Sequence, residues 1–176
     1  MRFTSFLLVA GLSACAGTSV AADSGGLGYR DASLQSAVLS IHNEERARLG
    51  VAGLAWDPAL ADGAAVWADE LARTETFHHS DRHARRGIGE NLAMGARGYF
   101  SPAVLVNLWL AERRDFRPGV FPNVSISGDW EAIGHYSQMV WRSTTRVGCA
   151  VRSSARNDYL VCRYSPAGNM DNRPVY

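Results

Sequence analysis

Apolar residues recur at helical spacing in the first two thirds of the chain. One stretch follows two candidate N-caps, Asp31 and Ser33, and ends before Gly50. A second begins at Asp57 and a third at Ser101, each followed by a proline in the first turn. The apolar faces of these predicted helices consist of Leu34, Val38, Ile41 and Leu49 in the first, of Leu60, Ala64, Trp67, Ala68 and Leu71 in the second, and of Leu105 and Trp109, joined by Glu112, in the third.

The last third of the chain combines a short helix with a hairpin. Large side chains recur at helical spacing from Ile133 to Arg142. His135 therefore lies on a helix face that is either buried or in contact with a specific group. Residues 145–152 and 158–164 contain β-branched side chains in the alternating pattern of strands, and they flank a polar turn. Cys149 and Cys162 lie on either side of this turn, so antiparallel pairing would bring them close enough for a disulfide.

Two intervening segments lack helical periodicity. Residues 87–98 predict a short strand or a turn of helix between loops, and residues 116–130 predict a long surface loop. Helices followed by a C-terminal hairpin indicate an α+β fold.

Four short motifs give the chain a specific resemblance. They are HNEER at 42–46, GENLA at 89–93, VNLWLAE at 106–112 and GHYSQ at 134–138. In this order they resemble the CAP superfamily of cysteine-rich secretory proteins, antigen 5 and plant pathogenesis-related proteins, here in a bacterial-type secreted form. The resemblance implies a CAP domain over residues 33–176, folded as a three-layer α-β-α sandwich with a small antiparallel sheet.

The same resemblance selects four candidate site residues. His79, Glu90, Glu112 and His135 match the two histidines and two acidic residues that line the central CAP cleft. Two imidazoles and two carboxylates can share protons or hold a divalent metal such as zinc. Glu131 is the alternative carboxylate, because it lies four residues before His135. A hydrogen-bonded cluster that holds no metal explains these four residues as well as a metal site does.

The other polar and aromatic residues singled out in the sequence are expected to have structural roles. His42 and Arg46 share a helix face with core residues, so we expect them to tie that helix to its neighbours. Tyr136, Trp141 and Tyr164 are expected in the core.

The first 22 residues predict a secretory signal peptide. An apolar run too short to cross a bilayer follows Arg2, and small residues end it at Ala22. A competing interpretation places a lipobox before Cys15, which would anchor the protein to the cell envelope through an acyl chain. Residues 23–32 are expected to form a flexible linker. The predicted localisation is extracellular or periplasmic, or envelope-bound if Cys15 is lipidated.

The charge composition excludes several functions. The 176-residue chain has 18 basic residues, all of them arginine, against 17 acidic ones. A net charge of +1 provides no field to gather nucleic acid, and the lack of lysine rules out Schiff-base catalysis. The run from Arg82 to Arg86 is expected to be a solvated loop.

Function follows from the resemblance. The leading hypothesis is a secreted binding module whose His/Glu cleft takes zinc and whose apolar surface takes a lipid, a sterol or a protein partner. The alternative is a metal-dependent peptidase or other hydrolase that uses the same four residues. A serine hydrolase is disfavoured, because Ser80 and Ser137 are only sequence neighbours of histidines. A third hypothesis is a peptide signal, since residues 166–176 resemble the C-terminal peptide released from plant members.

Overall fold

The computed structural model describes the backbone of residues 25–176 and the side chains from Ser33 onward. The predicted signal peptide and the predicted lipidation at Cys15 lie outside the described residues. Within residues 25–176, none of the helices combines the length and the hydropathy that a membrane span requires.

The three predicted long helices are present. They are α1 (Gly25–Arg48), α2 (Pro58–Thr74) and α3 (Pro102–Ala111), and α4 (Gly134–Met139) is the predicted short helix. Two 3₁₀ helices, η1 (Glu112–Asp115) and η2 (Trp130–Ile133), were not predicted. Asp57 caps α2 by accepting hydrogen bonds from the amides of Ala59 and Leu60. The helix α1 begins before its predicted caps, so it includes most of the segment expected to be a linker.

The sheet has the order β1-β3-β4-β2. Its strands are β1 (Ala55–Trp56), β2 (Gly89–Ala96), β3 (Arg146–Ser153) and β4 (Asn157–Ser165). The strands β2, β4 and β3 pair antiparallel as predicted, but β1 pairs parallel with β3, which makes the sheet mixed. Local alternation could not reveal β1, because the strand has only two residues.

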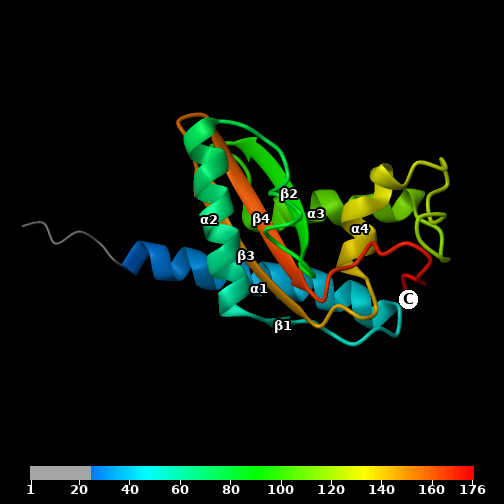
Figure 1. The fold of residues 1–176 in the computed structure, drawn as a ribbon. Coiled ribbons are helices and arrows are strands. Elements are labelled where there is room, and N and C mark those ends of the chain that lie inside the picture. Colours follow the sequence, from blue (N-terminus) through cyan, green and yellow to red (C-terminus); the bar gives the residue numbers. More distant parts are fainter. Residues whose placement is uncertain (1–24) are drawn as a thin grey trace, which may run out of the picture.

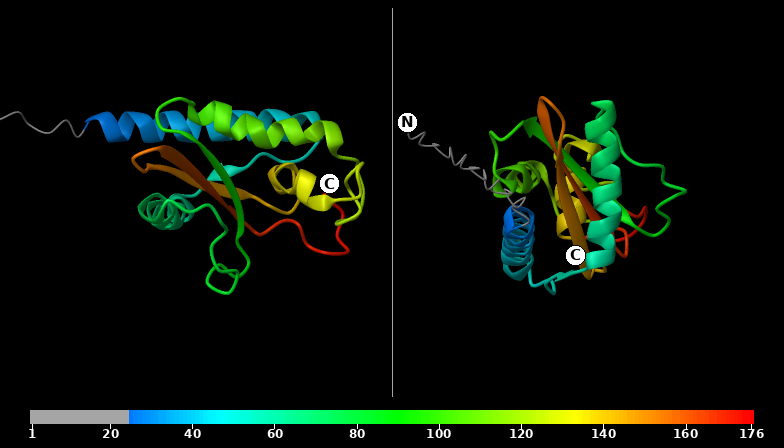
Figure 2. Two further views of the ribbon diagram at one scale, coloured as in Figure 1. Left: turned by 90° about the horizontal axis from the view of Figure 1, so that it is seen from above. Right: turned by 90° about the vertical axis from the view of Figure 1, so that its left-hand side faces the viewer.

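The elements form three layers. Figures 1 and 2 show α2 on one face of the sheet and α1 and α3 on the other, and α4 contacts α3. Gly148 lets α2 approach the sheet closely, because a Cβ there would lie 2.3 Å from the backbone nitrogen of Ala61. The larger core lies on the opposite face and includes Leu34, Leu105, Val147 and Leu160. The α-β-α sandwich is therefore confirmed.

The disulfide prediction is confirmed. Cys149 and Cys162 lie directly opposite each other on β3 and β4 and are bonded. Both are buried in the larger core, so the bridge fastens the hairpin on the face that receives α1 and α3.

The C-terminal tail packs into the domain. Val175 is fully buried, donates from its amide to the carbonyl of Gly119 and accepts from the amide of Arg142. Further back, the amide of Gly168 donates to Oε1 of Gln138 on α4. The tail is thus an integral part of the larger core.

Candidate functional site

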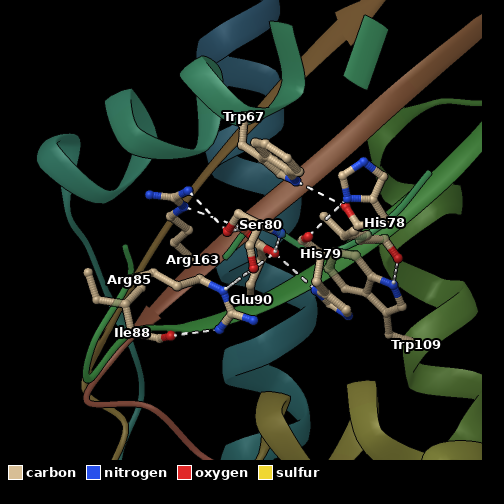
Figure 3. Close-up of polar contacts among 10 residues, drawn as sticks. Trp67, His78, His79, Ser80, Arg85, Ile88, Glu90, Trp109 and Arg163 are labelled. Carbon is tan, nitrogen blue, oxygen red and sulfur yellow. Dashed lines mark hydrogen bonds and ion pairs between the residues drawn. The ribbon is translucent and has the colours of Figure 1, made fainter. Parts of the chain in front are cut away.

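His79 and Glu90 form the first half of the predicted site. Nδ1 of His79 lies 2.9 Å from Oε1 of Glu90, and a carboxylate only accepts, so Nδ1 carries the proton. The same oxygen accepts from the amide of Ser80 at 2.9 Å, and Oε2 accepts from Oγ of Ser80 at 2.7 Å (Figure 3). The Glu90 side chain is buried, whereas His79 is half exposed, which leaves its Nε2 as the nitrogen free for a ligand.

Two arginines complete the surroundings of Glu90. Nε of Arg85 lies 3.7 Å from Oε1, and Nε of Arg163 lies 3.6 Å from Oε2 (Figure 3). Burial opposes ionisation of Glu90, but the hydrogen bonds from His79 and Ser80 and the charge of Arg85 outweigh it. The net pKa of Glu90 therefore lies below its ordinary value, and the side chain is a fixed anion at neutral pH.

His135 and Glu112 form the second half. Nδ1 of His135 donates to Oε1 of Glu112 at 2.6 Å, and the amide of Tyr136 donates to Oε2 at 2.9 Å. Glu112 ends α3 and begins η1, so its carboxylate reaches the first turn of α4. The His135 ring stacks on the indole of Trp109 at a centroid distance of 6.0 Å. These contacts fix the plane of the ring and again leave Nε2 without a protein partner among the described residues.

The edge strand β2 links the two pairs. Asn91, which follows Glu90, donates from Nδ2 to the carbonyl oxygen of His135 at 3.1 Å. Nε1 of Trp109 donates to the carbonyl of Leu92 at 3.1 Å. In Figure 3 the ring of His79 projects from Glu90 toward this indole.

The predicted quartet is thus two His–Glu pairs that flank β2. Among the side chains from Ser33 onward, no group of three or more His, Cys, Asp or Glu residues is placed to hold one metal ion. Each carboxylate accepts hydrogen bonds from its own histidine and from backbone or serine donors.

The alternatives considered for this region take other roles. Glu131 lies exposed on η2, and the carboxylate that accepts the hydrogen bond from His135 is Glu112 instead. Oγ of Ser80 donates to Glu90, and Oγ of Ser137 donates to Oδ1 of Asn169 at 2.7 Å, with the carbonyl of Gly134 3.1 Å away. Neither serine forms a hydrogen bond to a histidine within the described part of the chain.

His42 and Arg46 are structural, as predicted. Nδ1 of His42 donates to the carbonyl of Val38 at 2.8 Å, so Nε2 accepts from the hydroxyl of Tyr164 at 2.9 Å. This hydroxyl also accepts from Asn91, which connects α1 to β2 and to the backbone of His135. The fully buried Arg46 donates to four backbone carbonyls. Tyr136, Trp141 and Tyr164 lie in the core as expected.

A second polar centre lies between α1 and α3. The buried Glu45 accepts from the hydroxyl of Tyr136 at 2.6 Å and pairs with Arg48 at 2.6 Å and Arg113 at 3.1 Å. Burial opposes ionisation of Glu45, but the hydrogen bonds from Arg48 and Tyr136 outweigh it and lower its pKa. Above this centre lies a groove of about 380 Å³, lined by Ile41, Glu44, Glu45, Arg48, Asn107, Leu110 and Arg113.

Comparison with known proteins decides the family. Residues 39–164 match CAP, the cysteine-rich secretory protein family. The chain belongs to this family. All four predicted site residues lie inside the matched range.

Relatives of this CAP protein come from an animal and from a plant. It is 34% identical to Scoloptoxin SSD976 of Scolopendra dehaani over 83% of this chain and 75% of the relative. It is 38% identical to Pathogenesis-related leaf protein 4 of Solanum lycopersicum over 74% of this chain and 76% of the relative. Among solved structures, it is similar to the crystal structure of NaASP2 with Zn²⁺, at 25% identity and a TM-score of 0.67, over 82% of this chain and 85% of the other.

Sequence reasoning missed the roles of two residues that shape the CAP site. Ser80 anchors Glu90 through two hydrogen bonds, and its position beside His79 was the available signal. Arg163 faces Glu90 across the β2–β4 ladder. Its role depends on that register, which no local pattern encodes.

Proposed function

We propose that this CAP protein is a secreted binding module that takes up a divalent cation, such as zinc, through the Nε2 atoms of His79 and His135. The observation that carries the proposal is the orientation of both imidazoles by a carboxylate on Nδ1. Metal-binding histidines in proteins usually donate their second N–H to a carboxylate or carbonyl in this way, which fixes the ring and raises the basicity of the ligand nitrogen.

In this proposal the two glutamates orient the histidines and do not act as ligands. Both oxygens of Glu90 accept hydrogen bonds, and both oxygens of Glu112 do the same. Two protein nitrogens are fewer than the three or four ligands of ordinary zinc sites, so solvent would complete the coordination and the affinity would be modest. The similarity to NaASP2, whose structure is described as being with Zn²⁺, supports the proposal.

The same geometry favours binding over hydrolysis. In the HExxH metalloproteases a glutamate acts as the general base beside the metal. Glu90 is an ionised carboxylate, but three donors and two arginines surround it and the side chain is buried. Secretion is supported by the family itself and by relatives such as Secreted protein RBT4 of Candida albicans, to which the chain is 33% identical over 81% of its length and 37% of the relative.

We expect zinc binding to weaken at least tenfold in His79→Ala and in His135→Ala, because each removes one ligand nitrogen. Glu112→Gln should weaken binding less, because its amide still reaches the ring but carries no charge. Calorimetric titration of the secreted protein with zinc chloride measures these changes. Binding should also fall as the solution becomes acidic, because protons compete for imidazole nitrogen.

His83→Ala is the matched control, because His83 is an exposed histidine on the arginine-rich loop. A wild-type protein that binds no zinc, or a His83→Ala variant that loses as much affinity as the two site variants, would refute the proposal. Retention of full affinity by His79→Ala and His135→Ala would refute it as well.

A second candidate ligand is a lipid whose acyl chain lies in the groove between α1 and α3. The groove offers apolar walls from Ile41 and Leu110, and its charged lining is balanced, because Arg48 and Arg113 pair with Glu45. Its volume of about 380 Å³ lies within the range of small-molecule sites.

Ile41→Trp should fill this groove and lower the affinity for a fluorescent fatty acid about tenfold or more. Val66→Trp, an equivalent change at an exposed position of α2, should leave the affinity unchanged. Fluorescence titration of both variants distinguishes the groove from general adsorption, and equal affinities would exclude it.

A further inference from the structure

Four apolar side chains are exposed together at the start of α3. Tyr99 and Phe100 occupy the turn between β2 and α3 and are 78% and 39% exposed. Val104 and Leu108, four residues apart on the helix, are 43% and 54% exposed. We refer to these four residues as the α3 patch.

The helix α3 is apolar on its outer face as well as on its inner one. Its inner face buries Leu105, Val106 and Trp109, and Asn107 is its one polar side chain. A helix at the surface of a soluble domain normally presents charged and polar residues to water. The outer face of α3 therefore lacks the composition of a surface that is only solvated.

The aromatic pair of the patch is held in place. The Phe100 ring lies against Gly95, where a Cβ would come within 2.4 Å of it, and Tyr99 meets Phe100 edge to face at 4.9 Å between centroids. A preorganised apolar surface loses little conformational entropy on docking.

The turn before α3 carries one exposed basic residue, Arg97, and the buried carboxylate of Asp158 accepts a hydrogen bond from the amide of Gly98 on the same turn. From Arg97 to Ala111 the sequence contains no acidic residue. Arg97 is exposed on the same turn, and within the described residues its side chain forms no ion pair. An exposed arginine beside apolar and aromatic side chains can contact an anionic head group while those side chains enter the interfacial region of a bilayer.

Size and position also favour a membrane over a second copy of the chain. Four partly exposed side chains fall well short of the roughly 800 Å² that each partner buries in a stable dimer. Leu34 packs in the same core as Leu105, and Figure 2 shows the β2–α3 turn beside the N-terminal half of α1. The chain that precedes Gly25 therefore joins the domain at the end that carries the patch, and this chain includes the predicted lipidation site, Cys15.

We propose that the α3 patch docks the domain onto the surface of a lipid bilayer, with Tyr99, Phe100, Val104 and Leu108 entering the interfacial region and Arg97 contacting anionic head groups. This role is separate from cation binding by the His–Glu pairs, because it uses none of their residues.

Flotation with lipid vesicles tests the proposal. All proteins carry Cys15→Ser, so that an acyl chain cannot contribute to binding. Vesicles consist of phosphatidylcholine alone or mixed with phosphatidylglycerol. Tyr99→Ser combined with Leu108→Ser should reduce partitioning into the mixed vesicles more than tenfold, because each substitution removes a large apolar side chain from the interface. Arg97→Glu should reduce partitioning about fivefold, and only into the anionic vesicles.

The control is Val66→Ser combined with Phe77→Ser, which changes two exposed apolar residues outside the patch. This control should partition like the starting protein. The proposal is overturned if the starting protein does not float with either vesicle, or if the control loses as much binding as the patch variant. It is also overturned if sedimentation reveals a dimer that the patch substitutions dissociate while vesicle binding stays unchanged.

Discussion

Replacement of Arg46 by methionine is expected to lower the free energy of unfolding by about 4 kcal/mol. The guanidinium donates to the carbonyls of Ala52, Met139, Trp141 and Thr144 at 2.7 to 3.0 Å. The carbonyl of Trp141 also accepts from the amide of Thr144, but the other three would lose their partner. Each buried group left unsatisfied costs about 1 to 3 kcal/mol, and neighbouring losses are not fully additive.

Burial lowers the pKa of Arg46 to about 10, so the side chain is still charged at neutral pH. Its positive charge is balanced by carbonyl dipoles, with no carboxylate among its hydrogen-bond partners. Urea denaturation at pH 7 measures the effect, and Arg82→Met, an exposed substitution, should change stability by less than about 0.5 kcal/mol. A loss below about 1 kcal/mol for Arg46→Met would mean that water replaces the guanidinium at low cost.

The second large effect is a loss of stability in acid through His42. Burial lowers the pKa of this residue to about 4, with the charge of Arg46 adding to the decrease and the Val38 carbonyl opposing it. In the unfolded chain histidine titrates near 6.5. Between these values the unfolded state binds more protons, so stability is complete above about pH 6.5 and is lost as the pH falls toward 4.

A difference of 6.5 − 4 in pKa corresponds to about 3 kcal/mol, of which about 2 kcal/mol should be lost between pH 7 and pH 5. Urea denaturation across this range measures the slope. His42→Gln should be less stable at pH 7 but should lose much less stability on acidification. His78→Gln, which changes an exposed histidine, should keep the wild-type slope. A wild-type slope in His42→Gln would assign the acid sensitivity to other groups.

Sequence patterns predicted those elements whose signals are local. Helix α2 is recognised from its apolar stripe and its Asp57 cap, and the hairpin from its alternation and its two cysteines. Strand β1 and the 3₁₀ helix η1 could not be predicted, because each is only a few residues long. Helix α1 extends through glycine-rich sequence that local propensity assigns to a linker.

In the candidate site, too, the sequence identified the residues but not the contacts between distant segments. Family motifs selected His79, Glu90, Glu112 and His135, but they could not indicate that each glutamate is committed to one histidine. That pairing arises from contacts between segments distant in sequence. Glu112 reaches α4 from the end of α3, and Arg163 meets Glu90 through the register of β2 and β4. Whether a metal joins the two pairs stays a prediction.

The packing of the C-terminal tail constrains the hypothesis of a peptide signal. A protease that cut before Pro166 would remove Val175 from the larger core and would break its backbone bonds to Gly119 and Arg142. It would also take Gly168 away from Gln138 on α4, the helix that begins with Gly134 and His135. Release of a messenger peptide would therefore remove a buried side chain from the larger core and a hydrogen bond from α4, so the remaining domain would be less stable than the intact protein.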